Sequence, residues 1–416
     1  MKPNFLILFL LTTTIGWSQQ TMTLDACYNL VNENYPLAKQ TGMLSAQQES
    51  EMAAINTEKL PQFNLSAQAT YQSDVIEIPL ENSSIEPLNK DQYRTTLSVN
   101  QLIYGGGLIS AKSNLTRAKY DADIKQVEVY LYQLKTQVNQ LYFSILLTQE
   151  KYQLLLSKQA QLRIKLKEVI SGIENGVLLP TSNKTIEVEL LKIDQDIKAT
   201  LKDKATLISS LSSLIGFELN DQNKFETPLI STNISSTLNR PELELFQLKR
   251  EEIDASELLL SKENLPKLSG FVDGGYGNPG LNILDNSFQG FYTVGLKLKW
   301  NVFDWKANKK QRKSLLINKD IIDNDSDVFE LNTNIKLNEY EADINKLTAM
   351  LASDTEIIDL RREVLSATES QLQNGIITTS VYITELTNLY EDESRLVTHR
   401  IQLELVKSNY NIIQGN

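Results

Sequence analysis

"IKQVEVYLYQLKTQVNQLYFSILLTQEKYQLLL", residues 124–156, is the stretch that decides the fold, because its apolar residues recur in alternating steps of three and four. Continued to residue 173, this seam is broken only by Thr148 and Gln159. A sustained seven-residue repeat is typical of left-handed coiled coils. At ~1.5 Å per residue, a helix over residues 107–173 would run roughly 100 Å.

The same seam occurs a second time, 199 residues further along the chain. There it is interrupted at Asp354, Arg361 and Thr368. Upstream of the seams, "NYPLAKQ" at Asn34 matches "NRPELEL" at Asn239, and in both copies a second proline follows 25 residues after the first. Matched anchors in the same order indicate an internal repeat.

The chain is therefore expected to divide into a first repeat, residues 19–215, a linker, residues 216–238, and a second repeat, residues 239–416. Each repeat would hold a helix, two strands, a long helix and a return helix. An Asn-Gly pair ends each long helix, which is a helix-stop signal. The return helices are predicted over residues 181–214 and 380–413.

Four short segments alternate between apolar and polar residues, which is the periodicity of strands. They cover residues 63–71, 93–99, 268–276 and 292–300, and loops near residues 73–92 and 277–290 join them in pairs. Phe271 breaks the third segment, because it falls among the polar positions. Aromatic residues gather at the strand ends on the apolar face, at Phe63, Tyr71, Tyr93, Tyr276, Tyr292 and Trp300.

Two interpretations of these strands are open. They could form a soluble sheet with one solvated face, or they could cross an outer membrane, where ~9–11 tilted residues with aromatic ends are expected. Four strands cannot close a membrane barrel, since bacterial examples begin at ~8 and lipid tolerates no open sheet edge. A barrel would therefore pool strands from several chains, and three chains would leave room for a channel.

The first 18 residues predict export from the cytoplasm. Lys2, an apolar run from Phe5 to Leu11 and the small residues Gly16 and Ser18 together form a secretory signal peptide. No later stretch approaches the ~20 apolar residues that a spanning helix needs.

Cys27 is a candidate lipid-attachment site because it follows the signal peptide. Asp25 and the polar stretch "SQQTMT" before it favour instead a small buried helix residue. A single cysteine also rules out an intramolecular disulfide framework.

The composition argues against several classes of function. A net charge of −11 disfavours nucleic acid as a partner, since phosphates need clustered Lys and Arg. The one histidine, one cysteine and five methionines show no metal-ligand spacing. His399 is expected to be a solvated helix residue, with no catalytic set around it. We therefore expect no catalytic residue, no cofactor and no metal site.

The glycines of "YGGGLISAK", which begins at Tyr104, invite comparison with a phosphate-binding loop. The spacing matches neither G-x-x-x-x-G-K-[ST] nor G-x-G-x-x-G, and the second copy, "VFDWKANKK" at residues 302–310, has no glycine. Both copies share an aromatic residue that ends a strand and is followed by a long helix. These strand-to-helix corners comprise Tyr104, Gly105, Gly106, Gly107, Phe303 and Asp304, with the glycines allowing unusual backbone angles.

Several stretches together resemble the TolC-like outer-membrane efflux proteins, over nearly the whole mature chain. In the first repeat they are "TLDACYNLVNENYP", "LSVNQLIYGGGLISAKSNLTRAKYDA" and "SSLIGFEL". In the second they are "NRPELELFQLKREEIDAS", "LKLKWNVFDWKANKKQRKS" and "NGIITTSVYITEL". Cys27 stands where the family usually has alanine, which agrees with a packing role.

The resemblance implies a mostly helical chain with a small β part. In a homotrimer, four strands per chain would form a twelve-stranded barrel in the outer membrane of a Gram-negative bacterium, and antiparallel coiled-coil helices would continue it as a periplasmic α-barrel. Substrates of efflux or type I secretion would pass without covalent chemistry. The implied partners are a periplasmic membrane-fusion (adaptor) protein, an inner-membrane pump of the RND, ABC or MFS type, and outer-membrane lipid.

The resemblance also implies two sets of functional residues. Adaptor contacts would lie at the hairpin tips, which are Asn175, Gly176, Val177, Leu178, Asn374, Gly375, Ile376 and Ile377. Alternatively, Val177 and Ile376 pack the turns. Some relatives carry aspartate rings near the periplasmic end, but Val381 and Thr384 stand at those positions, with Glu385 adjacent, so the acidic gate is not reproduced.

The alternation of the strands suggests a further set. If the polar face of the strands points inward, Arg94, Asp273, Lys297 and Lys299 line the barrel lumen.

Other classes of protein remain alternatives. A periplasmic coiled-coil adaptor or a fibrous adhesin would also use long helices, but it would not be expected to repeat two strands plus a hairpin at matched spacing. A secreted enzyme would need a catalytic constellation, and the sequence offers none.

Overall fold

A computed structural model of the chain describes residues 21–76, 86–232 and 237–416. The predicted signal peptide, residues 1–18, lies outside the described residues. So do residues 77–85 of the first predicted loop and residues 233–236 of the predicted linker.

Seven helices and six strands make up this described part. The helices are α1 (Leu24–Asn34), α2 (Ala38–Thr57), α3 (Leu108–Glu174), α4 (Ser182–Ile215), α5 (Pro241–Glu263), α6 (Ala307–Gln373) and α7 (Thr379–Gln414). The strands are β1 (Thr21–Met22), β2 (Gln62–Tyr71), β3 (Asp91–Tyr104), β4 (Lys224–Phe225), β5 (Lys267–Asn278) and β6 (Gln289–Lys299). The order of helix, strand pair, long helix and return helix occurs twice, and α3 and α6 each contain 67 residues.

The chain forms two compact units, and each combines segments from both halves of the sequence. The first unit comprises the described parts of residues 1–38, 131–239 and 333–416. The second comprises those of residues 39–130 and 240–332.

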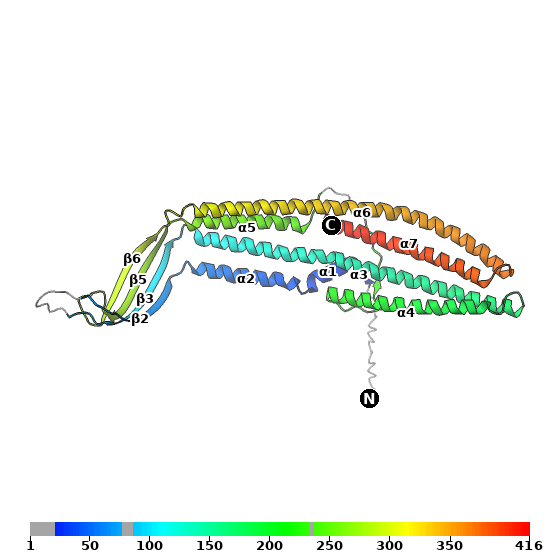
Figure 1. The fold of residues 1–416 in the computed structure, drawn as a ribbon, viewed down its shortest axis with the longest axis horizontal. Helices are drawn as coiled ribbons and strands as arrows, with labels where there is room; N and C mark the ends of the chain where they lie inside the picture. Colours follow the sequence, from blue (N-terminus) through cyan, green and yellow to red (C-terminus); the bar gives the residue numbers. More distant parts are fainter. Residues whose placement is uncertain (1–20, 77–85, 233–236) are drawn as a thin grey trace, which may run out of the picture. The chain divides into compact units, whose positions relative to one another are not determined.

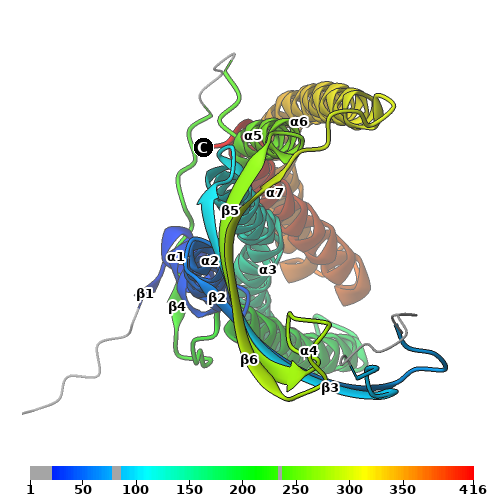
Figure 2. The ribbon, with the colours of Figure 1, turned by 90° about the vertical axis from the view of Figure 1, so that its left-hand side faces the viewer.

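The second unit contains a four-stranded antiparallel sheet in the order β2-β3-β5-β6. Figure 2 shows these strands lying side by side in one curved sheet. All four predicted strands are confirmed, but β3 runs to Tyr104, beyond the alternating segment that ended at residue 99. Its register against β5 shifts between Leu102 and Tyr104, and after this irregularity β3 ends at Tyr104, next to the glycines that precede α3.

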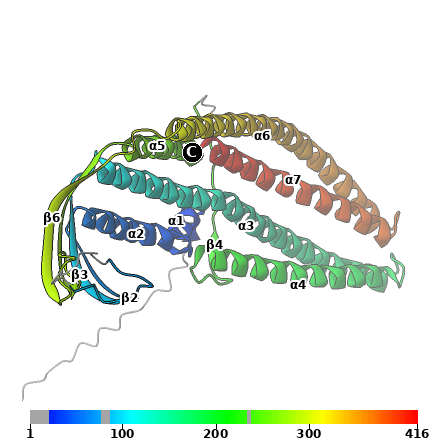
Figure 3. The ribbon, with the colours of Figure 1, turned by 60° about the vertical axis from the view of Figure 1, so that its left-hand side comes forward.

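The first unit is held together by the helical hairpins α3–α4 and α6–α7 (Figures 1 and 3). The predicted seam lies in their cores, where Leu155, Leu162 and Val169 of α3 pack with Leu372 of α6 and Leu386 of α7. The hairpin turns are closed by glycines in the left-handed region, as the Asn-Gly signal predicted.

Three of the polar residues that interrupt the seam, Gln159, Asp354 and Arg361, have partners on neighbouring helices, whereas the hydroxyls of Thr148 and Thr368 donate to carbonyl oxygens of their own helices. The Gln159 amide donates to Asp194 of α4 over 3.0 Å, and Arg361 donates to Asp392 and Glu385 of α7 over 3.0 and 3.1 Å. Asp354 lies 2.6 Å from Nδ1 of His399. The prediction that His399 is solvated was therefore wrong, because its side chain is only 12% exposed and faces a carboxylate across the α6–α7 interface.

Segments that are far apart in sequence meet beside α1 in the first unit. Cys27 is fully buried among apolar side chains from α1, α3 and α4, and β1 pairs in parallel with β4. The hydroxyl of Tyr142 lies 2.9 Å from the carbonyl oxygen of Met22 in β1 and 2.7 Å from that of Glu226. Cleavage next to Cys27 would remove β1, so this packing supports a buried structural cysteine over a lipidated one.

Candidate functional site

The register of the four-stranded sheet sorts its side chains onto two chemically distinct faces. Residues directly opposite one another project on the same face. Leu65, Leu97, Gly274 and Tyr292 form one such row across all four strands. The rows parallel to it on this face hold Phe63 with Val99, Val272 and Val294, and Leu268 with Leu298.

This apolar face is uncovered in the single chain. Its outer positions are between 66% and 79% exposed at Phe63, Leu65, Tyr71, Tyr292, Val294, Leu296 and Leu298. A continuous apolar surface of this kind marks contact with another apolar phase or a partner. The edge strands β2 and β6 also each keep one side without a neighbour within the described sheet.

The other face is polar and carries the four residues predicted to line a lumen. In each strand these residues alternate with those of the apolar rows, so the register places all four on the opposite face of the sheet: Arg94, Asp273, Lys297 and Lys299. Two guanidinium contacts from Arg94, each of 3.4 Å, reach the carbonyl oxygens of Pro279 and Gly280 beyond β5.

Two phenylalanines, Phe271 and Phe291, also lie on this polar face, and the sequence did not predict that they act alike. Phe271 of β5 lies opposite Gly295 of β6, and Phe291 of β6 lies opposite Gly275 of β5. A Cβ at Gly295 would come within 2.8 Å of the Phe271 ring, so each ring covers a glycine of the neighbouring strand. The only sequence feature that pointed to this arrangement was the apolar residue Phe271 at a polar position of its strand.

The corner in the second half has a side-chain cap that the first half lacks. Asp304 accepts from the backbone N–H groups of Lys306 and Asn308 and from the side-chain amide of Asn264, all at 2.9 Å. The hydrogen bond from the backbone N–H of Asn308, and then that from the side-chain amide of Asn264, hold the pKa of Asp304 below its ordinary value. This cap fixes the first turn of α6.

The corner in the first half relies on glycine instead. Gly106 and Gly107 have φ values of 63° and 84°, and a Cβ on Gly106 would lie 2.7 Å from the Cβ of Leu265. Tyr104 is the last residue of β3, as predicted. The prediction that Phe303 also ends a strand was wrong, because β6 ends at Lys299 and an irregular segment separates it from Phe303. Both Tyr104 and Phe303 are exposed.

The two hairpin tips have the same hydrogen-bonding pattern. Val177 N donates to Gly172 O over 2.9 Å, and Ile376 N donates to Gln371 O over 2.9 Å. The side-chain amides of Asn175 and Asn374 each donate back to a serine carbonyl at 2.8 Å.

Exposure separates the two apolar residues of each tip. Val177 is 51% exposed and Ile376 is 71% exposed, whereas Leu178 and Ile377 pack against the apolar cluster around Leu162 and Leu372. A Cβ on Gly375 would lie 3.1 Å from the carbonyl oxygen of Val177, so the tips are neighbours. Val177 and Ile376 therefore each leave more than half of their surface exposed at the tips.

The candidate gate residues occupy the first turns of α7. Val381 and Thr384 are exposed, and the Thr384 hydroxyl donates to Ser380 O over 3.0 Å. Glu385 accepts from Arg361 at 3.1 Å, and Arg361 is shared with Asp392. Glu385 is therefore part of an ion-pair network between α6 and α7 within one chain.

Two buried lysines near the tips were not anticipated. Lys158 donates to Glu189 of α4 at 3.0 Å and lies 4.8 Å from the ring centre of Tyr390 of α7. Lys165, one heptad later, contacts Glu168 of its own helix and Glu369 of α6, and it lies 5.1 Å from the ring centre of Tyr382 of α7. Their heptad spacing beside the seam was the available signal.

Within the described part of the chain, no helix has both the length and the apolarity needed to cross a membrane. Among the same residues, no three His, Cys, Asp or Glu side chains gather where they could hold a metal ion.

Comparisons with known proteins place the fold. No protein-family model matches the chain, and no curated protein matches it either. Solved structures do match. The channel protein CusC has a TM-score of 0.73 at 13% identity, with 98% of this chain and 96% of that chain covered.

Two further solved structures agree with this result. The outer membrane protein VceC of Vibrio cholerae has a TM-score of 0.69 at 12% identity, with 94% of this chain and 96% of that chain covered. The CmeC outer membrane channel of Campylobacter jejuni has a TM-score of 0.69 at 15% identity, covering 99% and 94%. The chain therefore has the fold of these outer-membrane proteins, which confirms the mostly helical fold class with a small β part.

Proposed function

We propose that this protein is the outer-membrane channel of an efflux or secretion system and that it acts as a homotrimer. One observation carries the proposal, the uncovered apolar face of a sheet with two open edges. Lipid would cover that face, and the edges would pair with those of neighbouring copies, because open sheet edges do not occur in hydrocarbon. Three copies would contribute twelve strands, enough for a channel.

The polar face would then line the pore. Arg94, Asp273, Lys297 and Lys299 would give the lumen mixed charge, and substrates would pass without covalent chemistry. The fold that this chain shares with solved outer-membrane channels supports the placement in the outer membrane of a Gram-negative bacterium. The chain would be organised as two repeats, residues 19–215 and 239–416, joined by a linker.

The hairpin tips would contact a periplasmic adaptor, which would in turn couple the channel to an inner-membrane pump. Support comes from Val177 and Ile376, which leave apolar side chains exposed beside rigid glycine turns. Val381, Thr384 and Glu385 would lie at the periplasmic gate. The ion pair between Glu385 and Arg361 would then help to hold that gate within each protomer.

Two measurements on the full-length protein test the proposal. Membrane fractions are separated, and the protein is expected in the outer-membrane fraction. The molar mass of the detergent-extracted protein is then measured by light scattering, and the mass of a trimer is expected. The trimer is then added to planar bilayers, where stepwise conductance is expected. Recovery as a soluble periplasmic monomer would contradict the proposal and favour an adaptor or a structural protein.

A further inference from the structure

The second strand-to-helix corner carries an unusual concentration of positive charge. Lys306, Lys309, Lys310, Arg312 and Lys313 fall within eight residues of a chain whose net charge is −11. The equivalent segment of the first half, residues 107–114, contains one lysine, and that lysine pairs with Glu58. The charge is therefore a property of this corner and not of the repeated fold.

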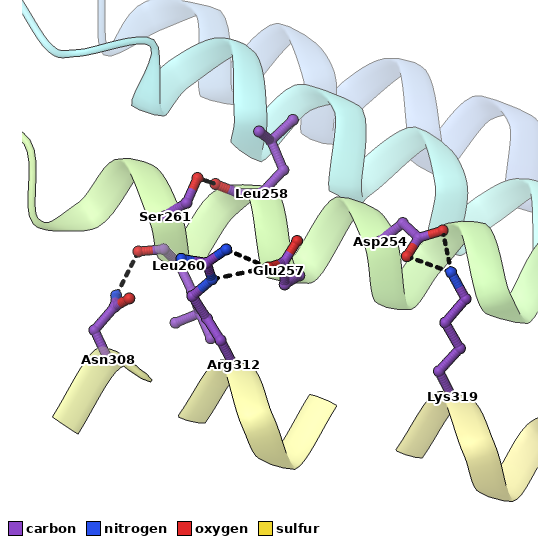
Figure 4. A network of polar contacts seen from close by, with 8 residues as sticks. All are labelled: Asp254, Glu257, Leu258, Leu260, Ser261, Asn308, Arg312 and Lys319. Carbon is purple, nitrogen blue, oxygen red and sulfur yellow. Dashed lines mark hydrogen bonds and ion pairs between the residues drawn. The ribbon is translucent and has the colours of Figure 1, made fainter. Parts of the chain in front are cut away.

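Only part of this charge is compensated by the packing of α5 against α6. Arg312 donates to Glu257 of α5 through Nε at 2.8 Å and Nη2 at 2.5 Å, as Figure 4 shows. Two turns further along α6, Lys319 contacts both carboxylate oxygens of Asp254 at 2.7 Å. Lys306, Lys309, Lys310 and Lys313 are exposed and make no ion pair with any described residue.

The uncompensated lysines surround one hollow. It measures about 490 Å³ and is lined by the four lysines together with Arg312, Glu257 and Leu316. Because Glu257 is already bonded to Arg312, the wall keeps an excess of ammonium groups. A hollow of this size lies within the range of ligand pockets, ~300–1,000 Å³, and its ammonium groups favour an anion.

Aromatic residues lie between β6 and the lysines along the chain. Trp300 directly follows β6 and is exposed. Trp305, which is also exposed, packs edge to face against Phe303 at 4.9 Å between ring centres. Apolar strand, aromatic residues and basic residues thus follow one another along the chain. That order is the one found where a membrane protein passes from hydrocarbon to headgroups.

We infer that this basic corner, defined as Lys306, Lys309, Lys310, Arg312 and Lys313, binds the phosphate headgroup of an anionic phospholipid in the periplasmic leaflet of the outer membrane. The inference rests on the proposed function, which places the sheet in that membrane. Clustered lysines beside a membrane attract anionic lipids, whereas zwitterionic headgroups offer no net charge to bind. A trimer would hold three such lipids.

Native mass spectrometry of the purified full-length protein tests the inference, with phosphatidylglycerol and phosphatidylcholine supplied in detergent. The test variant is K309Q/K310Q/K313Q, which leaves Lys306 and the backbone of the turn unchanged. Phosphatidylglycerol should remain on the unsubstituted protein, and the variant should bind it about 100-fold more weakly, since each lysine near an anionic headgroup contributes about fivefold. Phosphatidylcholine retention should not change.

The matched control removes three exposed lysines of α4, as K192Q/K198Q/K202Q, and should keep phosphatidylglycerol. Equal loss in this control, or no loss in the test variant, would overturn the inference. Displacement of the lipid by soluble glycerol 3-phosphate at equimolar concentration would also overturn it, because the site would then be one for free anions.

Conductance separates this inference from the proposed function. The test variant should form normal channels in bilayers of phosphatidylcholine alone. Normal channels without selective binding of phosphatidylglycerol would overturn the headgroup site and leave the channel intact. Failure of the unsubstituted protein to form trimers or channels would overturn the proposed function, and with it the membrane placement on which the headgroup site rests.

Discussion

Gly106 and Trp305 occupy equivalent positions 199 residues apart and share a left-handed backbone, with φ values of 63° and 54°. The residues that follow them repeat the relationship, since Gly107 has φ 84° and Lys306 has φ 64°. One corner thus adopts this backbone with glycines and the other with two larger residues, whose strain is offset by the side-chain cap from Asp304.

Substitutions at the two corners should therefore act in opposite directions. Gly106→Ala should lower the free energy of unfolding by about 2 kcal/mol, because of the left-handed backbone and the clash with Leu265. Lys306→Gly should raise it by about 0.5 kcal/mol. Denaturant titration measures both changes. Gly42→Ala, in the open interior of α2, is the control and should stabilise slightly. Equal behaviour of the two corners would contradict this account.

The stability of the second corner should fall at low pH. The pKa of Asp304 is held below its ordinary value in the folded protein, so the cap contributes fully above the unfolded pKa of about 3.8. That contribution is lost as pH falls through the lower folded pKa. The thermal midpoint of the unsubstituted protein should therefore drop towards that of Asp304→Asn below about pH 4. Asp320→Asn, an exposed change of the same charge, should leave the pH profile unchanged.

Loss of Lys165 should destabilise the end of the helical hairpins. Burial disfavours its charge, but Glu168 and Glu369 outweigh burial and raise the pKa of Lys165 above its ordinary value. Lys165→Met should cost roughly 1–2 kcal/mol, less than a fully buried pair because both carboxylates are about half exposed.

The control for this change is Lys167→Met on the exposed side of α3, with an expected cost below about 0.5 kcal/mol. The raised pKa also implies that this part of the stability is present below about pH 10.5 and is lost as pH rises through the folded pKa. A variant as stable as the control at pH 7 would contradict the packing of Lys165.

Cys27 should be chemically silent in the folded protein. It is fully buried, and burial raises the pKa of its thiol to about 12, so almost no thiolate is present at pH 8. A maleimide should label it only after unfolding, whereas an added thiol in Val177→Cys should react within minutes. Rapid labelling of native Cys27, or a mature mass that includes an acyl chain, would contradict its structural role.

The exposed tip residues should affect coupling without affecting the channel. The double variant V177D/I376D should abolish cross-linking to the co-expressed adaptor and leave trimer mass and conductance unchanged, because both residues are more than half exposed. Leu178→Asp should instead destabilise the hairpin, since Leu178 packs into the apolar cluster. Undiminished adaptor cross-linking in the double variant would exclude the tips as the docking surface.

Periodicity accounts for what the sequence predicted well. A heptad seam places apolar residues in every turn of a long helix. The predicted limits of α3, residues 107–173, therefore differ from the observed Leu108–Glu174 by only one residue at each end. The four strands were recognisable because each has one apolar face. Beyond Val99, the polar pair Asn100 and Gln101 breaks the alternation, and β3 continues there only because β5 pairs with it.

Partners across helices could not be read from periodicity. Asp354 and Arg361 were visible only as breaks in an apolar seam, and their partners lie on α7, 24 to 45 residues away in sequence. His399 looked solvated for the same reason. The matched backbone of Trp305 and Gly106 was also hidden, because nothing in the residue types signals a left-handed tryptophan.

The phenylalanine-over-glycine contacts between β5 and β6 constrain how this sequence can change over time. A side chain larger than hydrogen at Gly295 collides with Phe271, and one at Gly275 collides with Phe291. Gly295 can therefore be replaced only after the ring at Phe271 has become smaller. Gly275 is constrained further, because an added Cβ would also lie 2.6 Å from the carbonyl oxygen of Thr95, whatever residue replaces Phe291. In related sequences, the residues at Gly295 and Phe271 should covary, whereas Gly275 should be kept.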